Sequence, residues 1–275
     1  MATTTNTANG NNKTLIDQKQ VDKNISTRMT KNKVFKGIFL ACTLIGLIVL
    51  AALLIDTLIK GAGHLTPSFF TNFSSSTPSM AGVKGALVGT LWLMITIIPI
   101  SIVLGVGTAI YLEEYARKNP FTNFVKVCIS NLAGVPSVVF GLLGLTLFVR
   151  GMGVESLSLG KSILAGALTM SLLILPVIIV AAQEAIRAVP KSVREASYGL
   201  GANKWQTIYK VVLPAALPGI LTGFILALSR ALGETAPLIL IGIPTILLRL
   251  PSGIMDQFQA LPIQIYNWAK MPQEE

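Results

Sequence analysis

Residues 162–183 read SILAGALTMSLLILPVIIVAAQ, an apolar run without a single charged side chain. About 20 consecutive apolar residues are enough for one helix to cross the hydrocarbon core of a bilayer. Four further apolar runs occupy residues 34–59, 85–112, 127–149 and 214–243. The 275 residues are 52% hydrophobic and only 12% charged, whereas soluble domains carry about 25% charged residues. We therefore predict an all-α polytopic membrane protein with five transmembrane helices.

The net charge of +10 is distributed unevenly between alternate loops. Fifteen basic residues lie in the N-terminal segment up to Lys36 and in the loops 113–126 and 184–213, whereas the intervening loops and the C-terminal segment hold six. Lys and Arg are enriched in the cytoplasmic loops of membrane proteins. We therefore predict that the N-terminus and these two loops are cytoplasmic. The basic residues follow topology and do not indicate a nucleic-acid partner.

The chain divides into a polar tail and a transmembrane domain. Residues 1–33 are rich in Thr, Asn, Lys and Gln, which predicts a disordered cytoplasmic tail. Residues 34–275 form the transmembrane domain, because all five apolar runs lie there. The run 34–59 is too long for the core of a signal peptide and lacks a small-residue cleavage site, so we expect it to remain as an anchor.

Glycine and proline are frequent in the last four spans. Gly85 with Gly89, and Gly219 with Gly223, have the GxxxG spacing that allows two helices to approach closely. Helix breaks at membrane depth are tolerated where they are buried in protein or line a cavity. The pattern fits ordinary kinked packing, and it also fits a transport pathway built from broken helices.

Residues with catalytic or metal-binding chemistry are few. His64 is the single histidine, which excludes a histidine-based metal site or catalytic triad. Cys42 and Cys128 lie within apolar spans, where isolated buried thiols act as small hydrophobes. Gly160-Lys161-Ser162 resembles the end of a P-loop, but Glu155 stands where that motif requires its first glycine. We therefore expect a non-enzymatic chain without a cofactor, whose energy comes from a partner or a gradient.

A polar loop between the last two spans is patterned as two short helices. Residues 195–214 read EASYGLGANKWQTIYKVVLP. Gly201 follows the first of these helices, where a C-terminal cap requires a left-handed residue. The apolar face of that helix is formed by Val193, Ala196, Ser197 and Leu200.

Asn203 and Gln206 have the spacing of an N-cap and capping box at the start of the second helix. A second apolar face follows at helical spacing, formed by Trp205, Ile208, Tyr209 and Val212. Two short amphipathic helices joined at a glycine fit a unit that docks into the groove of a partner. They fit equally well an interfacial helix that lies on lipid.

This loop resembles the EAA loop of ABC importer permeases. The match consists of Glu195, Ala196, Ser197, Gly201, Val211, Leu213 and Pro214. Ser197 replaces the second alanine of the family pattern and Val211 replaces its isoleucine. The resemblance implies a MetI-like helix bundle of the type I importer class. It also implies that the cytoplasmic loop 184–213 couples to partner subunits, which bind the ATP.

Other segments resemble phosphate-specific permeases, namely residues 89–92, 107–116, 132–142 and 229–237. Residues 261–268 are similar to the external C-terminal portion of the PstA-type subunit. The resemblance covers about residues 34–275. It implies an inner-membrane importer of inorganic phosphate with a homologous PstC-type permease, two ATP-binding subunits and an external phosphate-binding protein. Such permeases continue into a final cytoplasm-directed helix, which we expect this sequence to lack or to have lost by truncation.

Arg230 and Glu234 are the only charged residues of the last span, and their spacing predicts one helix face and an ion pair. A charge at the bilayer centre costs about 2.5–3.5 kcal/mol on insertion scales, which favours a functional role. The planar fork of arginine suits tetrahedral oxyanions, and the resemblance implies that Arg230 lies on the phosphate path. A purely structural ion pair is the alternative.

Ser137 is a third candidate for the pathway, because it follows Pro136, where the helix is expected to break. Backbone donors exposed at the break would face an anion. The alternative is a hydroxyl that is hydrogen-bonded to its own helix.

Three other functions stay open. A permease for sulfate, molybdate or phosphonate would share the coupling loop. A gradient-driven transporter would use Arg230 and Glu234 as an ion relay. An intramembrane enzyme would need a catalytic pair at membrane depth, and none is evident in the sequence.

Overall fold

The computed structural model describes residues 18–75, 77, 80–117, 119–244, 246–247 and 249–271. Within these ranges the secondary structure is helical, apart from one isolated bridge between Ser162 and Gln257. The chain forms two units, Met1–Leu65 and Thr66–Glu275, which are described separately. Four helices are long and apolar enough to cross a membrane, or five if one bent pair counts as a span.

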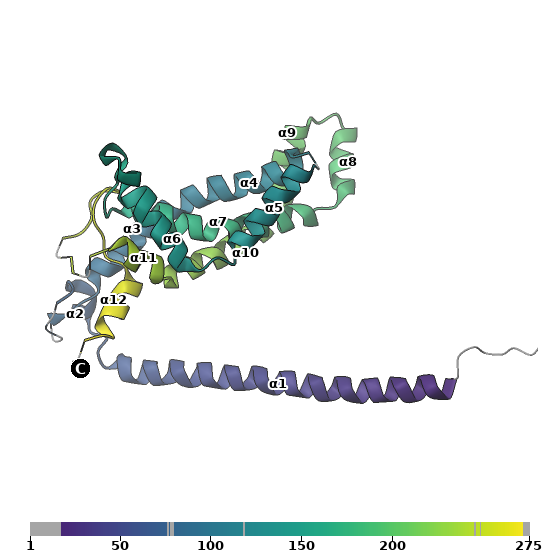
Figure 1. Cartoon of the computed structure of the whole chain (residues 1–275), viewed down its shortest axis with the longest axis horizontal. Helices are drawn as coiled ribbons and strands as arrows, with labels where there is room; N and C mark the ends of the chain where they lie inside the picture. Colours follow the sequence, from purple (N-terminus) through teal and green to yellow (C-terminus); the bar gives the residue numbers. More distant parts are fainter. Residues whose placement is uncertain are drawn as a thin grey trace, which may run out of the picture. The chain divides into compact units, whose positions relative to one another are not determined.

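The first unit contains one long helix, α1 (Gln18–Ala62), drawn in purple to blue in Figure 1. The part that could span a membrane runs from Arg28 to Ala62. Residues 18–33 are therefore helical, and the prediction of disorder is wrong for them. They contain no Gly or Pro, so the helix propagates outward from the apolar run without a new nucleation cost. Residues 1–17 of the predicted tail lie outside the described residues.

The second unit begins with α2 (Pro67–Thr71), α3 (Lys84–Ser101), η2 (Ile102–Val106), α4 (Gly107–Ile110), η3 (Tyr111–Tyr115), α5 (Pro120–Leu132), α6 (Ser137–Gly144) and η4 (Leu145–Val149). It continues with η5 (Gly151–Gly153), η6 (Glu155–Leu157), α7 (Ile163–Ala188), α8 (Lys191–Gly199), α9 (Lys204–Thr207), η7 (Ile208–Val212), α10 (Leu213–Gly233), α11 (Ala236–Ile241) and α12 (Leu261–Trp268). Helices η2, η3, η4 and η7 are single π-helical stretches.

Helix α7 lies at the centre of the second unit and packs against α3, α6 and α10 (Figure 1). Its buried face includes Ile174 and Ile178, which join a core with Leu93 and Ile97 of α3 and Phe224 of α10. The quoted run 162–183 is therefore the most enclosed span, which explains why it has no charged residue.

The two GxxxG pairs have different partners. Gly219 and Gly223 of α10 face Ala185 and Ala181 of α7, and a Cβ on Gly219 would lie 2.8 Å from the Ala185 Cβ. This pair confirms the predicted close approach of two helices. Gly89 instead faces the backbone carbonyl of Gln259, which belongs to the segment before α12. The helix–helix prediction is wrong for Gly85 and Gly89, because an extended segment occupies that space.

Two predicted spans are interrupted. The span predicted at 127–149 consists of α5 and the α6–η4 helix, which meet at a bend of 102°. Pro136 precedes α6 and lacks a backbone N–H, which disfavours a continuous helix. The span predicted at 214–243 is divided into α10 and α11, with Glu234 and Thr235 between them.

The two cysteines are free, and the structure exposes both of them within their own units. Cys42 lies on α1 and Cys128 lies on α5. We expected both thiols to be buried as small hydrophobes. That expectation is wrong within each unit, since neither thiol is packed inside it.

The segment before α12 closes one end of the second unit. The Ile163 N–H donates to the Asp256 carbonyl at 3.0 Å, and the Leu164 N–H donates to the Ile254 carbonyl at 2.9 Å. Phe258 is fully buried against Gly166 of α7. These two hydrogen bonds satisfy backbone N–H groups in the first turn of α7, because N–H groups at the start of a helix have no acceptor within the helix.

Asp256 is expected to make the fold of this segment sensitive to pH. Hydrogen bonds from the Ser252 N–H (2.7 Å) and the Ser252 hydroxyl (3.0 Å) hold the pKa of the Asp256 carboxyl below its ordinary value. A lowered pKa in the folded state contributes stability above the unfolded pKa of about 3.9, and this stability is lost as the pH falls through the lower folded pKa. Asp256→Asn should lower the thermal unfolding midpoint at pH 7.

The measurement is thermal unfolding of both proteins in detergent between pH 7 and about pH 3. The difference between the two midpoints should shrink as the pH falls below about 4, because the unfolded chain then takes up a proton that the folded carboxylate binds only at a lower pH. A difference that stays constant over this range would contradict the role of the carboxylate.

Candidate functional site

The predicted loop is a pair of short helices that turn at Gly201. Helices α8 and α9 flank this glycine at one end of the second unit (Figure 1). Gly201 has φ +82°, its N–H donates to the Tyr198 carbonyl at 2.9 Å, and the Ala202 N–H donates to the Ser197 carbonyl at 3.2 Å. These two bonds form a Schellman motif, which satisfies the last carbonyls of α8. The predicted left-handed cap is confirmed.

The start of α9 also follows the prediction. The Asn203 Oδ1 accepts from the Gln206 N–H at 2.8 Å, and the Gln206 Oε1 accepts from the Asn203 N–H at 2.9 Å. The two helices are joined by a hydrogen bond of 2.9 Å between the hydroxyls of Ser197 and Thr207. An alanine, which the family pattern has at position 197, would lack this bond. Ser197 therefore helps to fix the angle between the helices.

The second apolar face is divided, which corrects the prediction of a single surface. Ile208 and Val212 are buried. Trp205 and Tyr209 are exposed and their rings stack, with centroids 6.2 Å apart. The division accompanies the π-helical stretch η7, because its wider turn changes the angular spacing of side chains.

Large apolar side chains are exposed on the loop, among polar ones. Leu200 at the turn is 90% exposed, Trp205 is 62% exposed and Tyr209 is 61% exposed. Glu195 and Ala196 of the EAA-like stretch are exposed on α8. The stacked rings of Trp205 and Tyr209 are an exposed apolar surface of the kind that interaction sites use.

The inner side of the loop region is held by ion pairs that the sequence analysis missed. Glu113 of η3 forms ion pairs with Lys126 of α5 at 2.7 Å and with Arg187 of α7 at 2.8 Å. Arg187 also pairs with Glu184 at 2.9 Å. The signal in the sequence was the adjacent Glu113 and Glu114 at the end of an apolar span, facing loops rich in Lys and Arg.

Arg194 connects the loop directly to two spans. Its guanidinium donates to Glu114 at 3.1 Å and to the carbonyls of Ile186 and Val189 at 2.7 and 2.6 Å. The pair is largely buried, since the side chains of Arg194 and Glu114 are 17% and 10% exposed. Arg194 thus caps the end of α7 and binds α8 to η3.

The remaining predicted loop residues lie at the junction with the last span. Val211 is half-buried in η7, and Leu213 and Pro214 begin α10. A proline fits the first turn of a helix, where its missing N–H costs no hydrogen bond. Displacement of α9 therefore acts directly on the start of α10, with no flexible linker between them.

Arg230 and Glu234 do not form the predicted ion pair. Arg230 is exposed in the last turn of α10, and Glu234 is half-buried in the break that follows. Glu234 has extended backbone angles (φ −82°, ψ 119°), so the helical spacing on which the prediction rested ends before it. Neither side chain has an ion-pair partner among the described residues.

Ser137 is half-buried at the first position of α6. Its hydroxyl makes no hydrogen bond to its own helix in the described part of the chain, so that alternative finds no support. The two half-helices α6 and α11 pack together, because a Cβ on Gly141 would lie 2.8 Å from the Pro237 Cα. The elements that follow both breaks therefore lie side by side.

Comparisons with known proteins identify the family. The sequence pattern described as "Binding-protein-dependent transport system inner membrane component" matches residues 101–260. The "Phosphate transport system permease protein PstA 1" of Mycobacterium tuberculosis is 39% identical over 222 residues, covering 78% of this chain and 70% of that protein. The PstA of Yersinia pestis is 32% identical over 273 residues, covering 95% and 86%.

A "Probable ABC transporter permease protein YqgI" of Bacillus subtilis is 36% identical over 212 residues, covering 77% of this chain and 70% of the relative. The family pattern includes the whole loop 184–213, the central helix α7 and both interrupted spans. The all-helical fold, the membrane spans and the external energy source implied by the sequence agree with this match. The chain belongs to the family of multi-pass inner-membrane permease components of binding-protein-dependent transport systems, which work with ATPase and binding-protein partners.

Proposed function

We propose that the chain is the PstA-type permease subunit of an ATP-driven importer for inorganic phosphate. The observation that carries the coupling role is the α8–Gly201–α9 unit, which exposes Leu200 and Trp205 and is held to η3 by the ion pair of Arg194 with Glu114. The phosphate cargo is supported by the names of relatives that are similar over most of the chain.

The same unit favours docking to a protein over lying on lipid. Leu200 stands at the tip of the turn, and the chain reverses through a fixed Schellman motif instead of extending along one plane. An interfacial helix needs a continuous apolar face along its length. Helices that fill a partner's groove need a rigid projection with apolar anchors, which this loop provides.

The proposed assembly contains a second, PstC-type permease, two ATP-binding subunits at the loop 184–213 and an external phosphate-binding protein. The N-terminus is cytoplasmic in this proposal, because fifteen basic residues lie on that side against six on the other. Closure of the ATPases displaces α8 and α9. Arg194 passes the displacement to α7 through the Ile186 carbonyl and to η3 through Glu114, and α9 passes it to α10.

Arg230, Glu234 and Ser137 are the proposed pathway residues. Arg230 has five N–H donors without an ion-pair partner in the described residues, and its fork matches phosphate oxygens. The breaks at Pro136 and at Glu234 give the chain irregular backbone at membrane depth, which is tolerated where it lines a cavity.

The complex in proteoliposomes should take up labelled phosphate only with ATP on the coupling-loop side and binding protein on the other. Uptake by this chain alone, or uptake that collapses with an uncoupler while ATP remains, would favour a gradient-driven transporter. Competition by sulfate, molybdate or phosphonate at concentrations similar to phosphate would favour a permease for another oxyanion. The control is a vesicle with the assembled complex and a non-hydrolysable ATP analogue.

The Arg194–Glu114 pair should be necessary for the coupled complex. Arg194→Gln leaves Glu114 without its cation and the carbonyls of Ile186 and Val189 without a donor, and breaking a buried pair costs about 3–5 kcal/mol. We expect a lower unfolding midpoint and less phosphate moved per ATP.

The exposed pair Lys60–Asp56 provides the control, because Lys60→Gln should change stability by less than about 1 kcal/mol. The exchange of both charges, Glu114→Arg with Arg194→Glu, should restore part of the coupling, since the ion pair returns but the carbonyl caps do not. An Arg194→Gln complex with normal coupling would exclude this residue from transmission.

A further inference from the structure

Cations accumulate at one end of the apolar part of α1. Between Asp22 and Asp56 the sequence has no acidic residue and five basic ones, which are Lys23, Arg28, Lys31, Lys33 and Lys36. The apolar run begins at Val34, so Lys33 directly precedes the hydrophobic segment and Lys36 lies in its first turn. At this depth a spanning helix passes from water through the layer of lipid headgroups.

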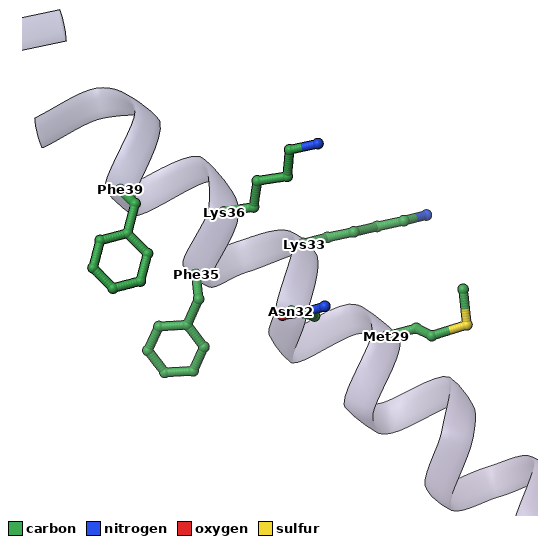
Figure 2. Close-up of a pocket in the computed structure, with 6 residues that line it drawn as sticks. All are labelled: Met29, Asn32, Lys33, Phe35, Lys36 and Phe39. Atoms are coloured by element: carbon green, nitrogen blue, oxygen red, sulfur yellow. The ribbon is translucent and has the colours of Figure 1, made fainter. Parts of the chain in front are cut away.

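Two kinds of side chain share this turn of α1. Figure 2 shows Lys33 and Lys36 extending to one side of the helix and the rings of Phe35 and Phe39 to another. With Met29 and Asn32 they line one shallow, open pocket on the surface of the helix. Residues three or four positions apart are neighbours on a helix surface, so the two ammonium groups are neighbours and so are the two rings.

The ammonium groups of this pocket are available to a ligand. Lys33 and Lys36 have no ion-pair partner in the described part of α1. At the opposite end of the same helix Lys60 is neutralised by Asp56 at 2.8 Å. The two ends of α1 thus differ in charge, and the helix between them has no charged residue.

We propose that Lys33 and Lys36 bind the phosphodiester headgroup of an anionic phospholipid, whose acyl chain packs along Phe35 and Phe39. Lysines near the end of a spanning helix direct their charge to the interface while their methylenes stay on apolar surface. Clusters of basic residues next to a spanning helix are typical of anionic-lipid binding. Free phosphate has no chain to cover the two rings. The proposal is independent of the transported ion.

The test uses the full complex in vesicles of equal parts phosphatidylglycerol and phosphatidylcholine, with a photoreactive benzoylphenylalanine in place of Phe39. Mass spectrometry of the crosslinked product gives the ratio of the two lipids bound. We expect phosphatidylglycerol to exceed phosphatidylcholine several-fold at position 39. The same probe in place of Leu58, near the neutralised Lys60, should give nearly equal amounts.

Lys33→Gln with Lys36→Gln should lower the lipid ratio at position 39 at least about fivefold, because one cation near an anionic surface contributes about that factor. Lys33→Arg with Lys36→Arg should preserve the ratio, which separates charge from a folding defect. Equal lipids at position 39 in the parent protein, an unchanged ratio in the glutamine variant, or crosslinks to protein instead of lipid would overturn the proposal. Displacement of the lipid by inorganic phosphate at matched ionic strength would indicate an ion site instead.

Discussion

Arg230→Ala is expected to abolish ATP-dependent phosphate uptake while the permease still assembles with its partners. Arg230 is exposed in the last turn of α10 and pairs with no carboxylate in the described residues, so its removal leaves no buried charge unpaired. Hydrogen bonds to charged groups contribute about 1.5–3 kcal/mol each, and a bidentate arginine makes two. We therefore expect uptake to fall by at least about 100-fold.

Uptake of labelled phosphate and co-purification of the subunits measure these two effects separately. Arg230→Lys is the matched variant, because it keeps the charge and loses the planar fork, and it should transport at an intermediate rate. Loss of assembly in Arg230→Ala would instead assign a structural role to this side chain. Unchanged uptake would remove Arg230 from the pathway.

Gly201→Val is expected to uncouple ATP hydrolysis from phosphate uptake. Gly201 has φ +82°, a conformation that costs a β-branched residue about 1–3 kcal/mol. No neighbouring atom lies within 4 Å of an added Cβ, so the effect comes from the backbone and not from a clash. Loss of the Schellman motif would change the angle between α8 and α9 and displace Leu200 and Trp205 from their docking positions.

Gly199→Val is the matched control. Gly199 is helical, its φ is not positive, and a Cβ there also meets no atom within 4 Å. It should retain coupling apart from a small loss of helix stability. Gly201→Asn should be tolerated better than Gly201→Val, because Asn adopts the left-handed conformation more easily. The measurement is phosphate transported per ATP hydrolysed, and a normal ratio in Gly201→Val would contradict the docking role of the turn.

Local features of the coupling loop could be predicted from the sequence. The cap at Gly201 and the capping box of Asn203 and Gln206 depend on hydrogen bonds between residues at most five positions apart. The positions of the spans could be predicted for a similar reason, because the length of an apolar run alone determines whether a helix can cross the bilayer. The family resemblance of the loop rests on the same short stretch.

The placement of Arg230 and Glu234 and the anchoring of the loop required the tertiary structure. The separation of Arg230 from Glu234 depends on where α10 ends, and the 102° angle of the bend at Pro136 depends on how α5 and α6 pack against α7. Glu114 and Arg194 are 80 positions apart in the chain. Periodicity and capping patterns predict contacts between residues within two helical turns of each other. Ion pairs and close approaches between distant segments form only when the helices pack around α7. The sequence by itself therefore determined the spans and the turn of the coupling loop, and the packing decided which charges hold that turn to the membrane helices.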